Sequence, residues 1–193
     1  MAPTLQRARR SGIGTYTFMY GGFIIDGGKT TDGGGTPSLL ARLTFPSDWR
    51  VLLVMDRDKM GCHGSAESRA FAELDAGVPS FDGIELAQRV RDAVEQGQFE
   101  AFAQGIGQLQ DFMGRSFAHA QGGKPYVSAD VAAALHRLQE AGVRGCGQSS
   151  WGPTGFAFFK SAGEAKTAQR MLADISTIDT YVSAASEKGA IYT

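Results

Sequence analysis

Residues 144–159 read Arg144-Gly-Cys-Gly-Gln-Ser-Ser-Trp-Gly-Pro-Thr-Gly-Phe-Ala-Phe-Phe159 and connect a strongly helical pattern to an apolar, aromatic segment typical of a strand. Glycine lets a backbone turn at positive φ and approach a ligand closely. Successive N–H groups of such a loop can form a concave anion site, to which Ser and Gln side chains add donors. We interpret the loop as a phosphate or pyrophosphate cradle. The alternative is a long turn without a ligand, which Gly and Ser also favour.

Helical patterns fill the chain upstream of this loop. Apolar residues recur at helical spacing over 84–94 and 99–117, so they are expected in the core rather than at a cofactor. Ser128 is predicted to cap a further helix that ends before Gly142. Downstream of the loop, a last helix is expected at about 164–175.

The N-terminal part predicts two strands. A short turn of helix leads to a strand at Phe23–Ile25, which ends at Asp26 beside glycines. A carboxylate there is well placed for a metal ion or a sugar hydroxyl, and an Asx-turn is the alternative. Residues 27–37 are a glycine-rich connector, either an active-site loop or a linker. The apolar run from Trp49 to Asp56 predicts a strand buried on both faces.

Together these elements predict an α+β fold. Helices would lie on one face of a small, mostly antiparallel sheet, and residues 189–192 could add an edge strand. We see no internal repeat.

Two further loops could hold an anion. Arg10-Ser-Gly-Ile-Gly14 precedes the first apolar segment, although a solvated basic terminus has the same composition. His63 lies in a second glycine-containing loop before a helix expected at about 66–74, where it is a candidate ligand or acid; a solvated histidine is the alternative. No spacing of His, Cys, Asp or Glu resembles a closed zinc site.

The composition limits the partners. The chain has 193 residues and a net charge of −1, which predicts no general electrostatic grip on nucleic acid or an anionic membrane. Two distant cysteines and the lack of a secretory pattern favour a reducing cytoplasm. No apolar run approaches the roughly 20 residues of a membrane span.

Several motifs taken together resemble the β-ribofuranosylaminobenzene 5′-phosphate synthase family of the GHMP kinase superfamily. They are Arg10-Ser-Gly-Ile-Gly14, Tyr20-Gly-Gly-Phe-Ile-Ile-Asp-Gly-Gly28 and Gly147-Gln-Ser-Ser-Trp-Gly-Pro-Thr154. The resemblance implies a GHMP-like C-terminal domain over 46–193, preceded at 1–45 by a remnant of the N-terminal domain. It therefore also implies a shortened enzyme, a C-terminal piece, or a subunit that needs a partner.

The family joins phosphoribosyl pyrophosphate to a para-substituted benzoate, such as 4-aminobenzoate, and releases pyrophosphate and carbon dioxide on the way to tetrahydromethanopterin. The resemblance implies Mg²⁺ as a cofactor, with Asp26 as a ligand to the metal or the sugar. The implied phosphate and substrate contacts, with Arg10 supplying charge, are Ser11, Gly12, Gly14, Gly145, Gly147, Gln148, Ser149 and Ser150. Trp151 would stack on an aromatic ring, or instead anchor the loop in the core.

Two other functions remain open from the sequence. One is an ATP-dependent small-molecule kinase of the same superfamily, although Gly147-Gln-Ser-Ser-Trp departs from the plain glycine run of such kinases. The other is a non-catalytic binding or regulatory subunit. An unpaired strand at Phe23–Ile25 would have an open edge, which a second copy or a partner chain would cover.

Overall fold

The computed structural model describes residues 11–28, 35–59, 83–118 and 121–191. The helices and strands follow one another along the chain as α1 (Ile13–Tyr20), β1 (Phe23–Asp26), β2 (Leu39–Leu43), β3 (Arg50–Asp56), α3 (Gly83–Glu95), α4 (Phe99–Ala118), α5 (Ala129–Glu140), β4 (Cys146–Gln148), β5 (Gly155–Phe159), α6 (Ala162–Met171) and β6 (Ile178–Ser183). The predicted α+β class is confirmed.

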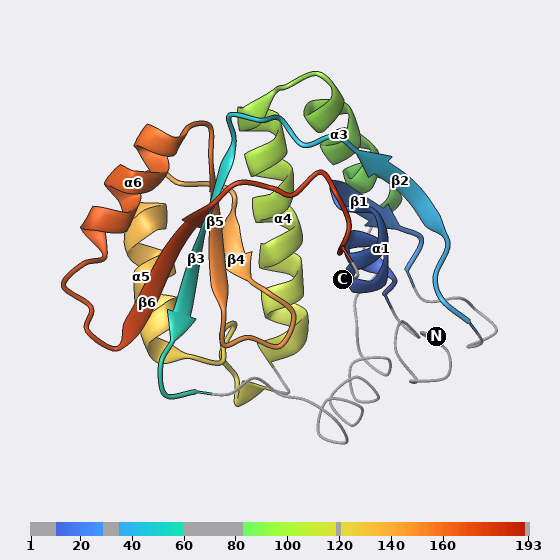
Figure 1. Cartoon of the computed structure of the whole chain (residues 1–193). Helices are drawn as coiled ribbons and strands as arrows, with labels where there is room; N and C mark the ends of the chain where they lie inside the picture. The colour runs from blue at the N-terminus through green and yellow to red at the C-terminus, as the bar shows by residue number, and fades with distance from the viewer. Residues whose placement is uncertain (1–10, 29–34, 60–82, 119–120, 192–193) are drawn as a thin grey trace.

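A four-stranded antiparallel sheet forms the centre, with the order β4-β5-β3-β6. Its β3 strand has a neighbour on each side, and Leu52 and Val54 on one face are fully buried. The other face is only partly covered and Met55 is 40% exposed, so the expectation of a strand buried on both faces is wrong. Helices α5 and α6 cover one face of this sheet (Figure 1) and close the first core. The residues of that core include Leu52, Val54, Val131, Leu135, Leu138, Ala157, Phe159, Ala168 and Leu172.

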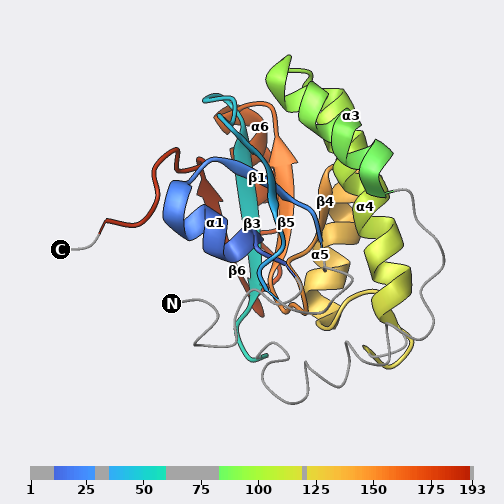
Figure 2. The same cartoon turned by 90° about the vertical axis from the view of Figure 1, so that its right-hand side faces the viewer.

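A second, aromatic core joins the sheet to the two-stranded β1–β2 unit. Phe102 of α4 is fully buried, and its ring contacts those of Phe45 and Trp49 at centroid distances of 5.5 and 5.0 Å. Phe23 of β1 and Phe158 of β5 meet the same ring. Helices α3 and α4 contribute to this core, whereas α1 lies at the opposite side of the view in Figure 2.

The ends of α5 form as its sequence predicts. The Ser128 side chain accepts a hydrogen bond from the Val131 N–H at 3.1 Å, which satisfies one free donor of the first turn. Gly142 adopts φ +92°, and the Val143 N–H bonds back to the Leu138 carbonyl. Both features are typical of helix ends that the sequence specifies locally.

Three boundaries differ from those predicted. The edge strand is β6, not residues 189–192, because Ile178–Ser183 pairs along the whole of β3 while residues 189–191 form no strand. Helix α6 ends at Met171, and the residues after it form turns instead of continuing to 175. Strand β2 was not expected; it pairs antiparallel with β1 and so covers one of its edges.

No helix in the described ranges combines the length and apolar character needed to cross a bilayer. The helix expected at 66–74 lies outside the described residues, as do Cys62 and His119.

Candidate functional site

The segment predicted as a long glycine-rich loop is a β-hairpin. Gly147 and Gln148 belong to β4 and pair with Phe156 and Gly155 of β5. The turn is closed by a hydrogen bond from the Ser149 N–H to the Thr154 carbonyl at 2.9 Å. The expectation of a long loop is therefore wrong, because β4 and β5 pair as far as Gln148 and Gly155, directly beside the turn. Only residues 149–154 remain outside the ladder.

Gln148 holds this hairpin to two other parts of the chain. Its side chain is 6% exposed, and its Oε1 accepts a hydrogen bond from the Val127 N–H at 2.8 Å. Its Nε2 donates to the Gln121 side chain at 3.0 Å and to the Ser150 carbonyl at 3.1 Å. A buried amide with three partners fixes its surroundings, because each lost partner would leave a buried polar atom unpaired.

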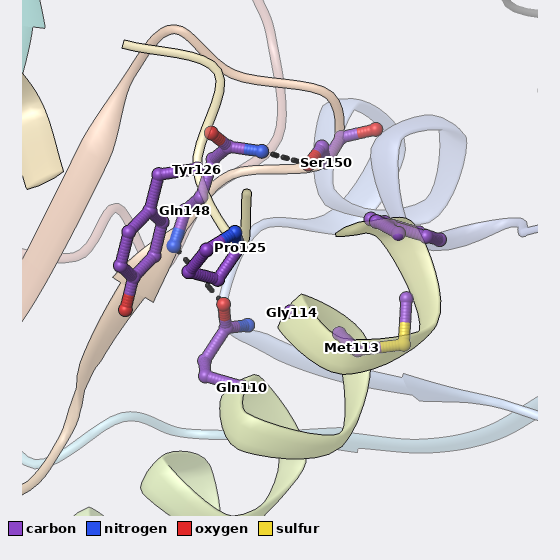
Figure 3. Close-up of a pocket in the computed structure, with 8 residues that line it drawn as sticks. Gln110, Met113, Gly114, Pro125, Tyr126, Gln148 and Ser150 are labelled. Atoms are coloured by element: carbon purple, nitrogen blue, oxygen red, sulfur yellow. Dashed lines mark hydrogen bonds between the residues drawn. The ribbon is translucent and has the colours of Figure 1, made fainter. Parts of the chain in front are cut away.

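Gln110 of α4 completes the arrangement. Its Oε1 accepts a hydrogen bond from the Gln148 N–H at 3.0 Å (Figure 3). A Cβ added at Gly147 would overlap the side chain of Gln110, so glycine is required there by close packing. Gly145 lies similarly close to Ala103, at 3.0 Å from an added Cβ to its Cα. Neither glycine therefore needs a ligand to explain it.

Three backbone donors of the hairpin already have acceptors. The Gln148 N–H bonds to Gln110, the Ser149 N–H to Thr154 and the Gly152 N–H to Ser149. By contrast, the side chains of Ser149 and Ser150 are exposed at the turn. An anion at this turn would thus be contacted by serine hydroxyls rather than by a nest of these N–H groups.

Trp151 is buried in the hairpin turn. Its side chain is 3% exposed, and its ring stacks on Phe117 at a centroid distance of 4.3 Å. Trp151 thus anchors the hairpin in the core, the alternative given for it, because Phe117 of α4 already stacks on its ring where an arene was expected.

Two pockets border the hairpin. The smaller, about 60 Å³, is lined by Gln110, Met113, Gly114, Phe117, Pro125, Tyr126, Gln148 and Ser150 (Figure 3). It is far below the roughly 300 Å³ of common ligand sites and has room for a few waters or a small substituent. The larger, about 340 Å³, is lined by Gln104, Gly107, Gln108, Asp111, Gln139, Val143, Arg144 and Cys146. Burial raises the pKa of the Cys146 thiol there to about 11, so it remains protonated at neutral pH.

The N-terminal glycine motif forms a separate cluster around Asp26. The carboxylate Oδ2 accepts hydrogen bonds from the Ser11 hydroxyl at 2.8 Å, from the Gly12 N–H and from the Ile13 N–H at 3.1 Å. Its Oδ1 accepts from the Gly28 N–H at 3.1 Å. Asp26 thereby caps the start of α1, where the helix dipole favours negative charge.

Of the residues predicted to contact phosphate, Ser11 and Gly12 contact Asp26, whereas the described contacts of the hairpin residues do not reach this cluster. The Ser11 hydroxyl and the Gly12 N–H both donate hydrogen bonds to Asp26. Gly14 faces open space, because a Cβ added there would have no atom within 4 Å. The Gly28 N–H donates to the Asp26 carboxylate, which is the contact of an Asx-turn, the alternative role given for Asp26. Arg10 and His63 lie outside the described residues.

Among the described residues no three His, Cys, Asp or Glu side chains gather as metal ligands. Magnesium is commonly held by one or two carboxylates together with substrate phosphates. Asp26 alone fits that mode, with most of the ligands supplied by a bound substrate and water.

A third polar cluster was missed by sequence reasoning. The Asp56 carboxylate at the end of β3 accepts a short hydrogen bond of 2.5 Å from the fully buried Ser128 hydroxyl. Burial alone would raise the pKa of Asp56, but the hydrogen bonds that it accepts from the Ser128 hydroxyl and from the N–H groups of Asp58 and Lys59 lower it below its ordinary value. Ser128 was predicted as a cap, yet nothing local in the sequence indicates its distant partner.

Comparison with known proteins shows similarity to one family over part of the chain. Residues 90–176 match the family model for the C-terminal region of GHMP kinases. The chain is 25% identical over 168 residues to the β-ribofuranosylphenol 5′-phosphate synthase of Methanothermobacter thermautotrophicus. That alignment covers 79% of this chain and 49% of the relative, so the chain spans about half the relative's length.

Solved structures share the fold. Homoserine kinase from Cytophaga hutchinsonii superposes with a TM-score of 0.51 at 19% identity, over 90% of this chain and 51% of that one. Mevalonate kinase from L. major, solved with R-mevalonate, gives 0.57 at 14% identity, over 89% and 51%. The comparisons support the resemblance: residues 90–176 are similar to the C-terminal region of GHMP kinases, and 79% of the chain is similar to a β-ribofuranosylphenol 5′-phosphate synthase.

Proposed function

We propose that this chain takes part in phosphoribosyl transfer from phosphoribosyl pyrophosphate to 4-amino- or 4-hydroxybenzoate, with decarboxylation, as a step of tetrahydromethanopterin biosynthesis. The observation that carries the proposal is its similarity, over 168 residues, to a protein named as a β-ribofuranosylphenol 5′-phosphate synthase. The product would be β-ribofuranosylaminobenzene 5′-phosphate or its phenol analogue.

The reaction needs charge placement more than a nucleophilic side chain. The bond from ribosyl C1 to the pyrophosphate oxygen breaks, and the ring carbon that bears the carboxylate forms a bond to C1. Carbon dioxide then leaves, and its bonding electrons restore the aromatic ring. Preorganised hydrogen-bond donors stabilise the departing pyrophosphate, and binding both substrates together supplies the orientation. Magnesium, when bound, would neutralise pyrophosphate charge.

The described residues suggest how the work is divided. The exposed hydroxyls of Ser149 and Ser150 would contact one phosphate group, with Gln148 keeping the turn in place. Ser11 and Gly12 at the start of α1 would contact another only by exchanging their bonds to Asp26 for bonds to the phosphate, which would release the Asp26 carboxylate for magnesium or a ribose hydroxyl.

The test mixes the protein with phosphoribosyl pyrophosphate, Mg²⁺ and each benzoate and records pyrophosphate and carbon dioxide. We expect release in equal amounts. Ser149→Ala should lower kcat/KM by roughly tenfold or more, as expected for a lost hydrogen bond to a charged group. Ser47→Ala is the matched control, because Ser47 is also an exposed turn serine but precedes β3.

Two outcomes would overturn the proposal. ATP turnover with a small alcohol, without pyrophosphate release from phosphoribosyl pyrophosphate, would indicate the kinase alternative. If the protein is inactive with both benzoates and with ATP, alone and in complex with any partner chain, a binding or regulatory subunit is indicated.

A further inference from the structure

Arg144 begins the stretch that joins α5 to the hairpin, and the proposed function gives its side chain no role. Other arginines of the described ranges donate to carboxylates, as Arg57 does to Asp179 and Arg137 to Asp174. The Arg144 side chain has no ion-pair partner in the described part of the chain, and it lines the pocket of about 340 Å³. Its charge is therefore available to a molecule that enters that pocket.

One wall of this pocket is a polar stripe on α4. Gln104, Gly107, Gln108 and Asp111 have the spacing i, i+3, i+4 and i+7, so they lie on one face of the helix. A polar stripe alone would be an ordinary solvated face. Here a second wall lies opposite it, and the two enclose a pocket.

The second wall is the end of α5 and the turn that follows. Gln139, Val143 and Arg144 line the pocket from this side, together with the buried Cys146 of β4, which lies beside α4 in Figure 1. A Cβ added to Gly107 would lie 2.6 Å from the Arg144 carbonyl oxygen. The two backbones therefore pack directly on each other, and this contact holds the walls at a fixed separation.

The two walls carry opposite charges. Asp111 on α4 and Arg144 on the turn both line the pocket, and among the described residues neither takes part in an ion pair. The pocket also borders the C-terminal end of α5, where the helix dipole favours a positive charge. A ligand with a carboxylate at one point and an ammonium group at another would match all three features.

The other polar side chains of the lining are amides. The Gln108 Oε1 accepts a hydrogen bond from Arg89 at 3.2 Å, which leaves the Gln108 NH₂ group as a donor for the pocket. Gln104 and Gln139 each add a donor and an acceptor. Val143 is the single aliphatic side chain of the lining, so an apolar ligand would leave these amides unpaired.

We propose that this pocket binds a free amino acid whose side chain carries an amide. Arg144 would hold the α-carboxylate and Asp111 the α-ammonium group through charge-assisted hydrogen bonds, and the glutamine amides would bind the side chain. The volume lies within the roughly 300–1,000 Å³ of small-molecule sites. The lining includes none of the residues proposed to contact phosphate, and the inference does not require the proposed activity.

The test is an NMR titration of the isotope-labelled full chain with L-glutamine, in the absence of phosphoribosyl pyrophosphate. Two analogues each lack one charge: glutaramic acid has no ammonium group, and 4-aminobutanamide has no carboxylate. We expect L-glutamine to shift the amide signals of residues 104–111 and 139–146. Each analogue should bind roughly tenfold or more weakly, as expected for a lost contact between charged groups.

Two variants assign the charges. Asp111→Asn should weaken L-glutamine binding roughly tenfold or more but leave glutaramic acid binding unchanged, because that analogue has no ammonium group. Arg144→Gln should weaken L-glutamine equally and leave 4-aminobutanamide unchanged. Arg115→Gln is the matched control, because Arg115 is also exposed but does not line the pocket. Circular dichroism checks that all three variants remain folded.

Several results would overturn the proposal. They are no binding of L-glutamine at millimolar concentration, equal binding of L-glutamine and both analogues, and equal weakening by Arg115→Gln. Signal shifts confined to the turn at 149–154 would also count against it, as would a crystal structure in which Arg144 and Asp111 pair and close the pocket. Because binding is measured without the phosphoribosyl substrate, its failure would leave the proposed function standing.

Discussion

At the scale of single residues, the contact between Ser128 and Asp56 has the clearest energetic consequence. Ser128 is fully buried, donates to Asp56 and accepts from the first turn of α5. It therefore ties the end of β3 to the start of the helix that covers it. Removing its hydroxyl would leave the Val131 N–H without its cap.

We expect Ser128→Ala to lower the free energy of unfolding by about 1–2 kcal/mol, the usual cost of a lost cap. Urea denaturation measures it. Ser161→Ala is the control, because Ser161 caps α6 in the same way but is not buried and has no carboxylate partner in the described contacts. A loss no greater at Ser128 than at Ser161 would contradict the role of the Asp56 bond.

The same contact predicts a dependence on pH. The pKa of Asp56 is lower in the folded protein than its ordinary value, so its bonds stabilise the fold at higher pH, and this stabilisation is lost as pH falls through the folded pKa. The stability difference between wild type and Ser128→Ala should therefore shrink in acid. An NMR titration should show the Asp56 pKa rising in the variant.

At the scale of elements, the hairpin of β4 and β5 is determined by packing against α4. Gly147 leaves room for Gln110, and Gln110 accepts from the backbone of Gln148. A large loss of activity on changing Gly147 would therefore indicate that α4 has been displaced, and would not by itself show that a phosphate contact has been lost.

Gly147→Ala should destabilise the protein by about 1–3 kcal/mol through overpacking. Gly14→Ala is the control, because an added Cβ there meets no atom within 4 Å and the glycine lies in a helix. Combining Gly147→Ala with Gln110→Ala should cost less than the sum of the two, by at least about 0.5 kcal/mol, in a thermal or urea denaturation cycle. Strict additivity would show that the two residues do not meet.

The elements that sequence reasoning predicted well are those with a strong local pattern. The apolar run of β3 and the helical spacing of α4 and α5 each fix a buried face. Strand β2 was not predicted, because Leu39–Leu43 has no buried residue and its sequence does not alternate between apolar and polar residues. Strand β6 was displaced to the tail in the prediction because only Ile178 of its six residues is buried.

The candidate site was predictable only in part. Asp26 was found because a carboxylate follows a strand and precedes glycines, which is a local pattern. The partners of Gln148 could not be found in the same way, since Gln110 and Gln121 come from segments that only the fold brings together. The shape of the hairpin turn likewise depends on pairing with β5, which a glycine count does not reveal.

At the scale of the whole molecule, stability is expected to be uneven. Helix α5 packs four fully buried residues into the first core, whereas α1 buries none. We expect the amide hydrogens of α1 to exchange faster with solvent than those of α5, because local opening costs less where little surface is buried. Hydrogen exchange with mass spectrometry measures both helices at once. Equal protection of the two helices would contradict this expectation.

The bond between Phe18 and Ala190 also has a consequence for synthesis on the ribosome. Helix α1 is translated before the central sheet and its helices, but Ala190, whose backbone N–H bonds to it, is translated after them. The central sheet and its helices can assemble before α1 is fastened. The apolar helix α1 therefore lacks this bond until Ala190 has been translated, and a chaperone can bind the helix during that interval.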